Sequence, residues 1–357
     1  MIITFRYRVK DGSQRKHLSR LATACNQVWN FCCATQRESE SRWKQGRVAK
    51  WKTHFDLINL ITGCAAELGI HSDSASAICG AFAKSRDKIK HAPKFRASFG
   101  SKRALGWIPM VPRAFKLTPG AITYKGRTFH FWQSRPIDGV IKTAQLVENA
   151  SGKWFVCFSA EVENKPSSGV GEVGIDLGLK TLATMSDGGK IDIQRTYRRF
   201  EPMLAIQQRA GNKNRVRAIH RKIADIRKDF LHKAANAIVA ANSVIYVGDV
   251  NAAKLAKTSM AKSVLDAGWS MFRNMLAYKS SRAQVHFAVV NERMTSQVCS
   301  ECGCLPLSRP RGIADLDKRH WICSDCGSEL DRDVNAARNI LRRGREHSPL
   351  VAEIPVL

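Results

Sequence analysis

Four cysteines are spaced as two pairs that could bind a metal ion. Cys299 and Cys302 form one Cys-x-x-Cys pair, Cys323 and Cys326 form a second, and 20 residues separate them. Two matched pairs at this spacing are typical of a tetrahedral zinc site, and they make redox-active cysteines a weaker interpretation. Four thiolates complete the coordination shell, so we expect the Zn²⁺ to be structural. Cys304 is then a spare cysteine that does not bind the metal.

One carboxylate stands within an otherwise apolar run. The sequence GIDLG, residues 174–178, places Asp176 between apolar residues, with a glycine at each end. Apolar and other residues alternate from 173 to 178, which predicts a strand. An acidic side chain is costly to bury there unless a cation meets it, and the glycines leave room for a metal ion or a nucleic-acid backbone. The alternative is that Asp176 caps a turn.

The charge of the chain indicates the class of partner. There are 58 Lys and Arg against 30 Asp and Glu, which gives a net charge of +28. Self-repulsion of this size destabilises a compact protein unless a polyanion offsets it, so nucleic acid is the expected partner. No apolar run approaches 18 residues and no signal peptide is evident, so we expect no membrane partner. Eleven cysteines without a disulfide pattern suit a reducing compartment and predict a cytoplasmic protein.

Two basic runs are candidates for contact with nucleic acid. Residues 84–103 carry basic side chains with Phe95 and Phe99 between them, and residues 195–228 carry eleven Lys or Arg against two acids. A basic run is often only a solvated face, but interleaved aromatic residues favour nucleic-acid binding. The candidate residues are Lys84, Arg86, Lys88, Lys90, Lys94, Arg96, Arg215, Arg217, Arg221 and Lys222.

The order of predicted elements places these residues in an α/β protein. A strand over 1–9 is followed by a mostly helical block over 11–103 and by short strands within 105–162, with a linker at 164–169. The next predicted strands lie within 171–178, 182–185 and 191–193, and basic helices follow. Strands at 244–247 and 285–290 then alternate with a helix over 261–281. This alternation predicts a partly parallel sheet covered by helices.

Three motifs resemble one known family. GIDLG at 174–178, TSQVCSECG at 295–303 and DRDVNAARNI at 331–340 resemble TnpB (OrfB), a family of transposon-encoded RNA-guided nucleases related to compact type V CRISPR effectors. The resemblance implies a wedge β-barrel at 1–10 and 104–163 that carries a helical recognition lobe at 11–103. It also implies a RuvC-like (ribonuclease-H-like) nuclease domain at 170–295 and 331–345, an inserted zinc finger at 296–330 and a tail at 346–357.

The same resemblance implies an RNA-guided DNA endonuclease, with a guide RNA and target double-stranded DNA as partners. Asp176 matches the first nuclease carboxylate of the family and Asp333 the third. Asp333 opens an alanine-rich helix, so its side chain can project from the first turn, while Asp331 fits an N-cap. Hydrolysis with two Mg²⁺ ions about 4 Å apart requires several carboxylates at one spot. Whether a monomer or a dimer binds one guide RNA is left open.

The second carboxylate of the family pattern is missing. A glutamate normally follows the fourth strand, but this chain has Gly248 there, followed by Asp249. Asp249 is displaced by one position, which turns a strand side chain to the opposite face. Glu292 follows the fifth strand, and adjacent parallel strands lie about 4.8 Å apart, so we predict that it supplies the missing carboxylate. The alternatives are that Glu292 is a loop residue before the zinc site, and that the protein is a nuclease-dead, RNA-guided DNA binder.

Overall fold

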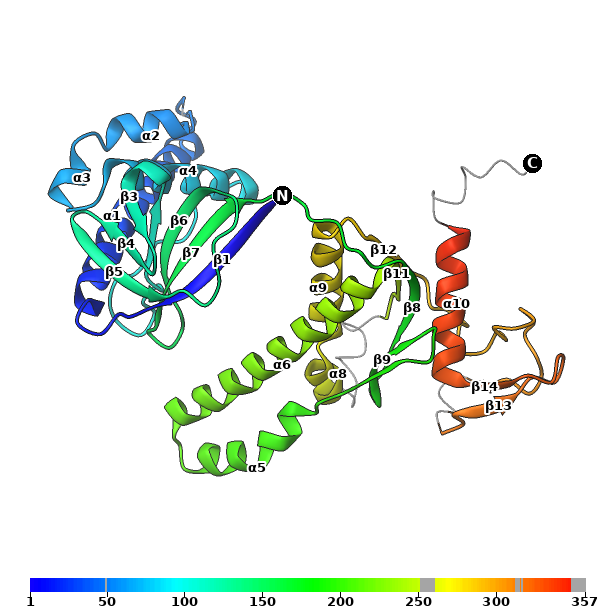
Figure 1. The fold of residues 1–357 in the computed structure, drawn as a ribbon. Coiled ribbons are helices and arrows are strands. Elements are labelled where there is room, and N and C mark those ends of the chain that lie inside the picture. The colour runs from blue at the N-terminus through cyan, green and yellow to red at the C-terminus, as the bar shows by residue number, and fades with distance from the viewer. Residues whose placement is uncertain (49, 251–260, 312–314, 316, 348–357) are drawn as a thin grey trace. The chain divides into compact units, whose positions relative to one another are not determined.

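The computed structural model describes residues 1–48, 50–250, 261–311, 315 and 317–347. The chain divides into two compact units, Met1–Glu163 and the part from Asn164 onward, and each has its own hydrophobic core. Figure 1 shows strands β1–β7 with helices α1–α4 in the first unit and the remaining elements in the second. The division falls at the predicted linker.

The first unit is built on an antiparallel, barrel-like sheet. Its strands lie in the order β2-β6-β7-β1-β5-β4-β3. Along β1, Phe5, Tyr7 and Val9 are buried while the side of Arg6 and Arg8 is more exposed, as the alternation predicts. The strands are β1 (Ile2–Val9), β2 (Trp107–Met110), β3 (Phe115–Thr118), β4 (Ala121–Tyr124), β5 (Arg127–Trp132), β6 (Val140–Glu148) and β7 (Trp154–Glu161), with the 3₁₀ turn η1 (Pro112–Ala114) between β2 and β3.

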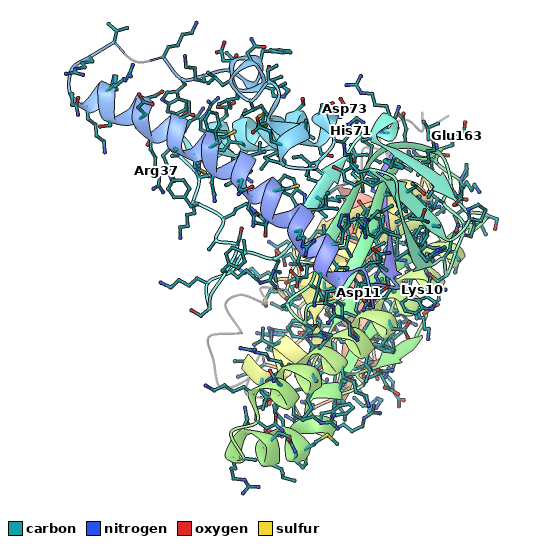
Figure 2. The ribbon with its side chains drawn as sticks, turned by 90° about the vertical axis from the view of Figure 1, so that its left-hand side faces the viewer. Lys10, Asp11, Arg37, His71, Asp73 and Glu163 are labelled. Atoms are coloured by element: carbon teal, nitrogen blue, oxygen red, sulfur yellow. The ribbon has the colours of Figure 1, made fainter. Side chains whose placement is uncertain are left out.

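Four helices are inserted between β1 and β2. They are α1 (Arg15–Lys44), α2 (His54–Leu60), α3 (Cys64–Glu67) and α4 (Ser72–Ile89). A stripe that includes Leu18, Cys25 and Cys32 buries one face of α1, at the 3.6-residue period that predicts this helix. Figure 2 shows Lys10 and Asp11 where β1 passes into α1, and His71 and Asp73 at the start of α4.

The block that was predicted to be mostly helical ends in a segment without helix. Residues 90–103 are not helical, because the chain runs alongside α1 and uses its side chains as hydrogen-bond partners. The amide of Asn30 accepts a hydrogen bond from the backbone nitrogen of Arg96 (2.7 Å) and donates one to its carbonyl (3.1 Å). The indole of Trp29 donates to the carbonyl of Lys94 (3.1 Å). Side chains thus replace the helical backbone bonds that this basic segment would otherwise form.

The second unit contains a mixed five-stranded sheet. The strands β8 (Gly171–Leu177), β9 (Thr181–Met185), β10 (Lys190–Asp192), β11 (Asn242–Gly248) and β12 (His286–Val290) lie in the order β10-β9-β8-β11-β12. β8 pairs with β9 and β9 with β10 in antiparallel fashion, whereas β8, β11 and β12 run parallel. The predicted hairpin and parallel section are confirmed, and β8 is the central strand.

Helices cover both faces of this sheet. One face packs α6 (Lys213–Ala241), α8 (Ala261–Ala267) and α9 (Trp269–Arg282), while α5 (Thr196–Arg209) packs on α6 in a small cluster of its own. The predicted helix over 261–281 is interrupted at Gly268, whose φ is +70°. No described helix is long and apolar enough to cross a membrane.

The helix α10 (Arg332–Glu346) packs on the other face, beside β8 (Figure 1). A β-carbon on Gly174 would clash with the carbonyl of Ala337, and one on Gly344 would clash with the ring of Tyr246. These glycines therefore allow α10 to lie close to the sheet. Because strand side chains alternate, Asp176 projects to the same face as Gly174, toward α10. The inserted strands β13 (His320–Ile322) and β14 (Glu329–Asp331) precede this helix.

Candidate functional site

Asp176 lies near the end of the central strand of the second unit. It pairs with Thr184 of β9, while Ile175 before it pairs with Val247 of β11. The pKa of Asp176 is raised to about 7, first by burial and then by the negative charges of Glu292 and Asp333, against a lowering effect of Arg332 and Arg319. A half-buried carboxylate beside two other carboxylates is an arrangement that favours the presence of a cation.

Glu292 occupies the space beside the missing glutamate. β11 and β12 are parallel neighbours, and Gly248 pairs with Val290 two residues before Glu292. A β-carbon placed on Gly248 would lie 2.7 Å from Oε2 of Glu292 and 3.2 Å from Cδ1 of Ile340. The pKa of Glu292 is raised to about 7, first by burial and then by the charge of Asp249, against a lowering effect of Arg273. The glycine therefore leaves the room that the Glu292 carboxylate fills.

Asp249 has a different position. Its side chain is exposed, and its Oδ1 accepts a hydrogen bond from the backbone nitrogen of Glu292 (3.0 Å). Its own backbone nitrogen donates to the carbonyl of Val290 (2.9 Å). Asp249 therefore braces the turn that carries Glu292, which agrees with the predicted reversal of side-chain direction.

Asp333 lies in the first turn of α10. The N-cap Asp331 accepts hydrogen bonds from the backbone nitrogens of Asp333 (2.9 Å) and Val334 (3.0 Å), which confirms its predicted capping geometry. Nη1 of Arg319 lies 2.8 Å from Oδ1 and 2.9 Å from Oδ2 of Asp333. Arg319 was not predicted from the sequence, because nothing in the spacing of a basic residue within the finger marks it as a partner of this carboxylate.

The three carboxylates converge from separate elements on one end of the sheet. They are near enough for Glu292 and Asp333 to affect the pKa of Asp176, and carboxylate oxygens are the ligands that Mg²⁺ prefers. Among the described residues, the ligand atoms of the four cysteines all lie within 4.8 Å of one another. The oxygens of the three carboxylates are farther apart than this. The residue types therefore suit divalent cations, while Asp333 is paired with Arg319 in this structure.

The four predicted zinc ligands form a compact cluster. Their sulfur atoms all lie within 4.8 Å of one another. The Cys299–Cys326 and Cys302–Cys323 sulfur pairs are 3.7 Å and 3.8 Å apart. A tetrahedron with zinc–sulfur bonds of about 2.3 Å has edges of about 3.8 Å, so the cluster fits Zn²⁺. The carbonyl of Cys304 accepts from the backbone nitrogen of Cys299 (3.0 Å), and its thiol lies outside the cluster.

Two family models match the second half of the chain. Residues 155–259 match a model described as a probable transposase (OrfB_IS605), and residues 269–340 match one described as a Cas12f1-like TNB domain. The second match spans the cysteine cluster and the start of α10. The chain is a relative of the TnpB (OrfB) proteins.

Similar proteins and structures agree with this relationship. A protein of Streptomyces pristinaespiralis, provisionally named an RNA-guided DNA endonuclease, is 36% identical over 59% of this chain and 55% of its own length. The provisionally named RNA-guided DNA endonuclease InsQ of Escherichia coli (strain K12) is 27% identical over 95% of this chain and 92% of its own length. A Cas12f1–sgRNA–target DNA complex contains a chain that matches with a TM-score of 0.57 at 13% identity, covering 92% of this chain and 82% of that one. This last likeness concerns the fold alone.

The structure of this TnpB relative divides the candidate basic residues into two groups. Arg86 is buried and donates to Gln36 Oε1 (3.3 Å) and the carbonyl of Lys52 (2.5 Å), and Arg96 donates to Asn26 Oδ1 (2.8 Å). We therefore assign these two arginines to the internal support of the helical block. The exposed members are Lys84, Lys88, Lys90, Lys94, Arg215, Arg217 and Lys222, while Arg221 is half-buried.

The carboxylate cluster predicts a pH-dependent stability. Asp176 and Glu292 have pKa values of about 7 in the fold against about 4 in an unfolded chain, so the fold retains protons that the unfolded chain has lost. The free energy of unfolding without Mg²⁺ should therefore contain a contribution that is present near pH 4 and lost as pH rises through 7. Glu292→Gln should remove part of this loss and melt at a higher temperature than wild type at pH 8, with a smaller difference at pH 5.

Thermal melts without Mg²⁺ at both pH values measure this effect. Asp192→Asn, which removes an exposed carboxylate on β10, is the control and should follow wild type. Equal melting temperatures of Glu292→Gln and wild type at pH 8 would show that the cluster stores no charge repulsion.

Proposed function

We propose that this chain is an RNA-guided DNA endonuclease whose nuclease site is formed by Asp176, Glu292 and Asp333. The observation that carries the proposal is the Glu292 carboxylate seated over Gly248, where a β-carbon would be 2.7 Å from Oε2. Loss of the usual glutamate alone does not explain why a second glutamate, Glu292, lies beside Gly248. Glu292 also lies on the face of the sheet that carries Asp176 and packs against α10. The names of the two bacterial relatives support the same activity.

The proposed domains follow the family pattern. Residues 1–10 and 104–163 would form the wedge barrel and 11–103 the recognition lobe, and the division of the chain at residue 163 supports this boundary. Residues 170–295 and 331–345 would form the RuvC-like nuclease domain around β8, β11 and β12. Residues 296–330 would form the zinc finger. The free thiols suit the reducing cytoplasm of a prokaryote.

Each residue of the proposed site has a separate task. Asp176, on the central strand, would bind the metal ions, and Glu292 and Asp333 would complete their ligand shells. Two Mg²⁺ ions, when bound, would activate the attacking water and stabilise the leaving oxygen of a phosphodiester. Arg319 forms an ion pair with Asp333 and neutralises part of the carboxylate charge when no metal ion is bound. Asp249 fixes the backbone of Glu292.

Guide and target would be bound mainly through charge and base pairing. The net charge of +28 suits a protein that holds a guide RNA and a double-stranded DNA target together. In guided nucleases the pairing of RNA with DNA reads the sequence, while the protein reads a short flanking motif and the backbone shape.

Cleavage of guide-matched DNA by the protein with its co-purified RNA tests the proposal. Wild type should cut in Mg²⁺, and Asp176→Asn should bind guided DNA with nearly the wild-type affinity and cut at least about 10²- to 10³-fold more slowly. Binding without cleavage by wild type, in Mg²⁺ and in Mn²⁺, would instead identify a guided DNA-binding protein. The glycine at 248 is the observation that favours this second candidate.

A further inference from the structure

A cavity at the end of α1 is lined entirely by residues of the first unit, whereas the carboxylates and the cysteine cluster belong to the second. α1 continues beyond Arg37 in Figure 2 toward this end. The cavity has a volume of about 500 Å³, within the range of pockets that hold small organic groups. It is lined by Glu40, Trp43, Lys44, Trp51, Lys90 and His91.

Two tryptophans from separate segments line this cavity. The side chain of Trp43, in the last turn of α1, is 71% exposed, and Trp51, in the connection to α2, is 36% exposed. Exposed aromatic surface that lines a cavity marks a candidate ligand-binding site. The guanidinium of Arg86 lies 5.2 Å from the ring centroid of Trp51. Because Arg86 is itself buried and held by hydrogen bonds, it fixes one ring in advance of binding.

The charge of the lining is positive. Lys44 and Lys90 are exposed, and neither forms an ion pair within the described part of the chain. Glu40 is the one acid of the lining, and its Oε1 accepts hydrogen bonds from the backbone nitrogen of Ala92 (2.7 Å) and from Gln36 (3.2 Å). The Glu40 carboxylate is thus bound by groups of the protein itself. The cavity therefore offers flat apolar rings together with two cations.

We propose that this cavity binds an unpaired base of a bound RNA by stacking it on Trp43 and Trp51. Lys44 and Lys90 then contact the phosphates on either side of that base. Flat rings match the faces of a base, and only an unpaired nucleotide exposes both faces. An apolar peptide would cover the two tryptophan rings but would leave Lys44 and Lys90 without a counter-charge. The inference rests on the proposed function only in taking RNA as the partner.

Fluorescence anisotropy with the full-length protein tests this site. The probes are a short single-stranded oligoadenylate RNA and a duplex RNA of the same length, measured near physiological salt to suppress contacts with the other basic residues. Trp43→Ala and Trp51→Ala should each weaken single-strand binding by about 5- to 150-fold, the usual effect of one stacked base. Binding of the duplex should change by less than about twofold.

Two kinds of variant separate stacking from charge and from folding. Trp43→Phe should recover most of the affinity lost in Trp43→Ala, because phenylalanine still stacks. Lys44→Ala should reduce the slope of log affinity against log salt by about 0.7, whereas the tryptophan variants should leave the slope unchanged. Trp132→Ala is the matched control, since Trp132 is an exposed tryptophan of the same unit, 5.5 Å from the Lys10 ammonium but on β5.

The outcomes distinguish this inference from the proposed function. If wild type binds the single strand and the Trp43 and Trp51 variants bind it equally well, the stacking site is wrong while guided cleavage is unaffected. If these variants lose single-strand and duplex binding alike, the tryptophans support the fold and the inference also fails. If wild type binds neither RNA, the RNA partner itself is contradicted.

Discussion

Replacing Glu292 with glutamine should lower the rate of guide-directed cleavage by at least about 10²- to 10³-fold in Mg²⁺. Glutamine keeps the shape of the side chain that lies over Gly248 but removes the charge that a divalent cation needs. Binding of guided DNA should change little, because its free energy comes from base pairing and phosphate contacts. Single-turnover cleavage, with binding measured in parallel, gives both quantities.

Asp249→Asn is the matched control for this variant. Asparagine keeps the oxygen that accepts the hydrogen bond from the backbone of Glu292, so the turn should hold. The charge of Asp249 raises the pKa of Glu292, so its removal should favour the ionised glutamate that binds metal. Nearly normal cutting by Asp249→Asn is therefore expected. The reverse pattern, in which Asp249→Asn is inactive and Glu292→Gln is active, would assign the carboxylate to Asp249.

Loss of the zinc ion should have the second large effect. Cys302→Ser removes one of four thiolates, and because metal binding and folding are coupled, the finger should unfold and the zinc content should fall from one per chain toward zero. Metal analysis and thermal melting measure this result. Cys304→Ser should keep the zinc, since its thiol lies outside the cluster.

The same change should reach the carboxylate site. Asn335 and Asn339 of α10 both donate to the carbonyls of Thr295 and Val298 at the start of the finger. Arg319, which holds Asp333, lies within the finger itself. Unfolding of the finger therefore frees the first turn of α10, and we expect Cys302→Ser to cut at least about tenfold more slowly. A zinc-free protein that cuts at the wild-type rate would show that the finger does not position Asp333.

Much of the second unit could be predicted because its pattern is local and repetitive. The alternation around Asp176 gives the strand β8 and the side to which the carboxylate projects, and two matched cysteine pairs define the metal cluster. The proximity of Glu292 to Gly248 could be predicted because both residues follow strands expected to be parallel neighbours, β11 and β12, and neighbouring strands lie about 4.8 Å apart.

Other features depended on contacts that no local pattern records. The short apolar run of β2 is interrupted by Pro109, and proline is tolerated there because β2 lies at the edge of the sheet, which the run itself does not indicate. Gly268 ends one helix and starts the next through its positive φ. Arg86 and Arg96 belong to a basic run by sequence, yet partners on α1 and the neighbouring loop turn them inward. Arg319 reaches Asp333 only after the finger has folded.

The relocation of the carboxylate can be tested by moving it back. The double variant Gly248→Glu/Glu292→Gly places a glutamate at the family position and opens the space that Glu292 fills in wild type. The measurement is its single-turnover rate of cutting guide-matched DNA in Mg²⁺, compared with Glu292→Gly alone. Our account predicts that the single variant is inactive and that the double variant returns to within about tenfold of wild type, since one carboxylate again completes the metal site. A double variant that binds guided DNA normally but cuts no faster than Glu292→Gly would contradict it.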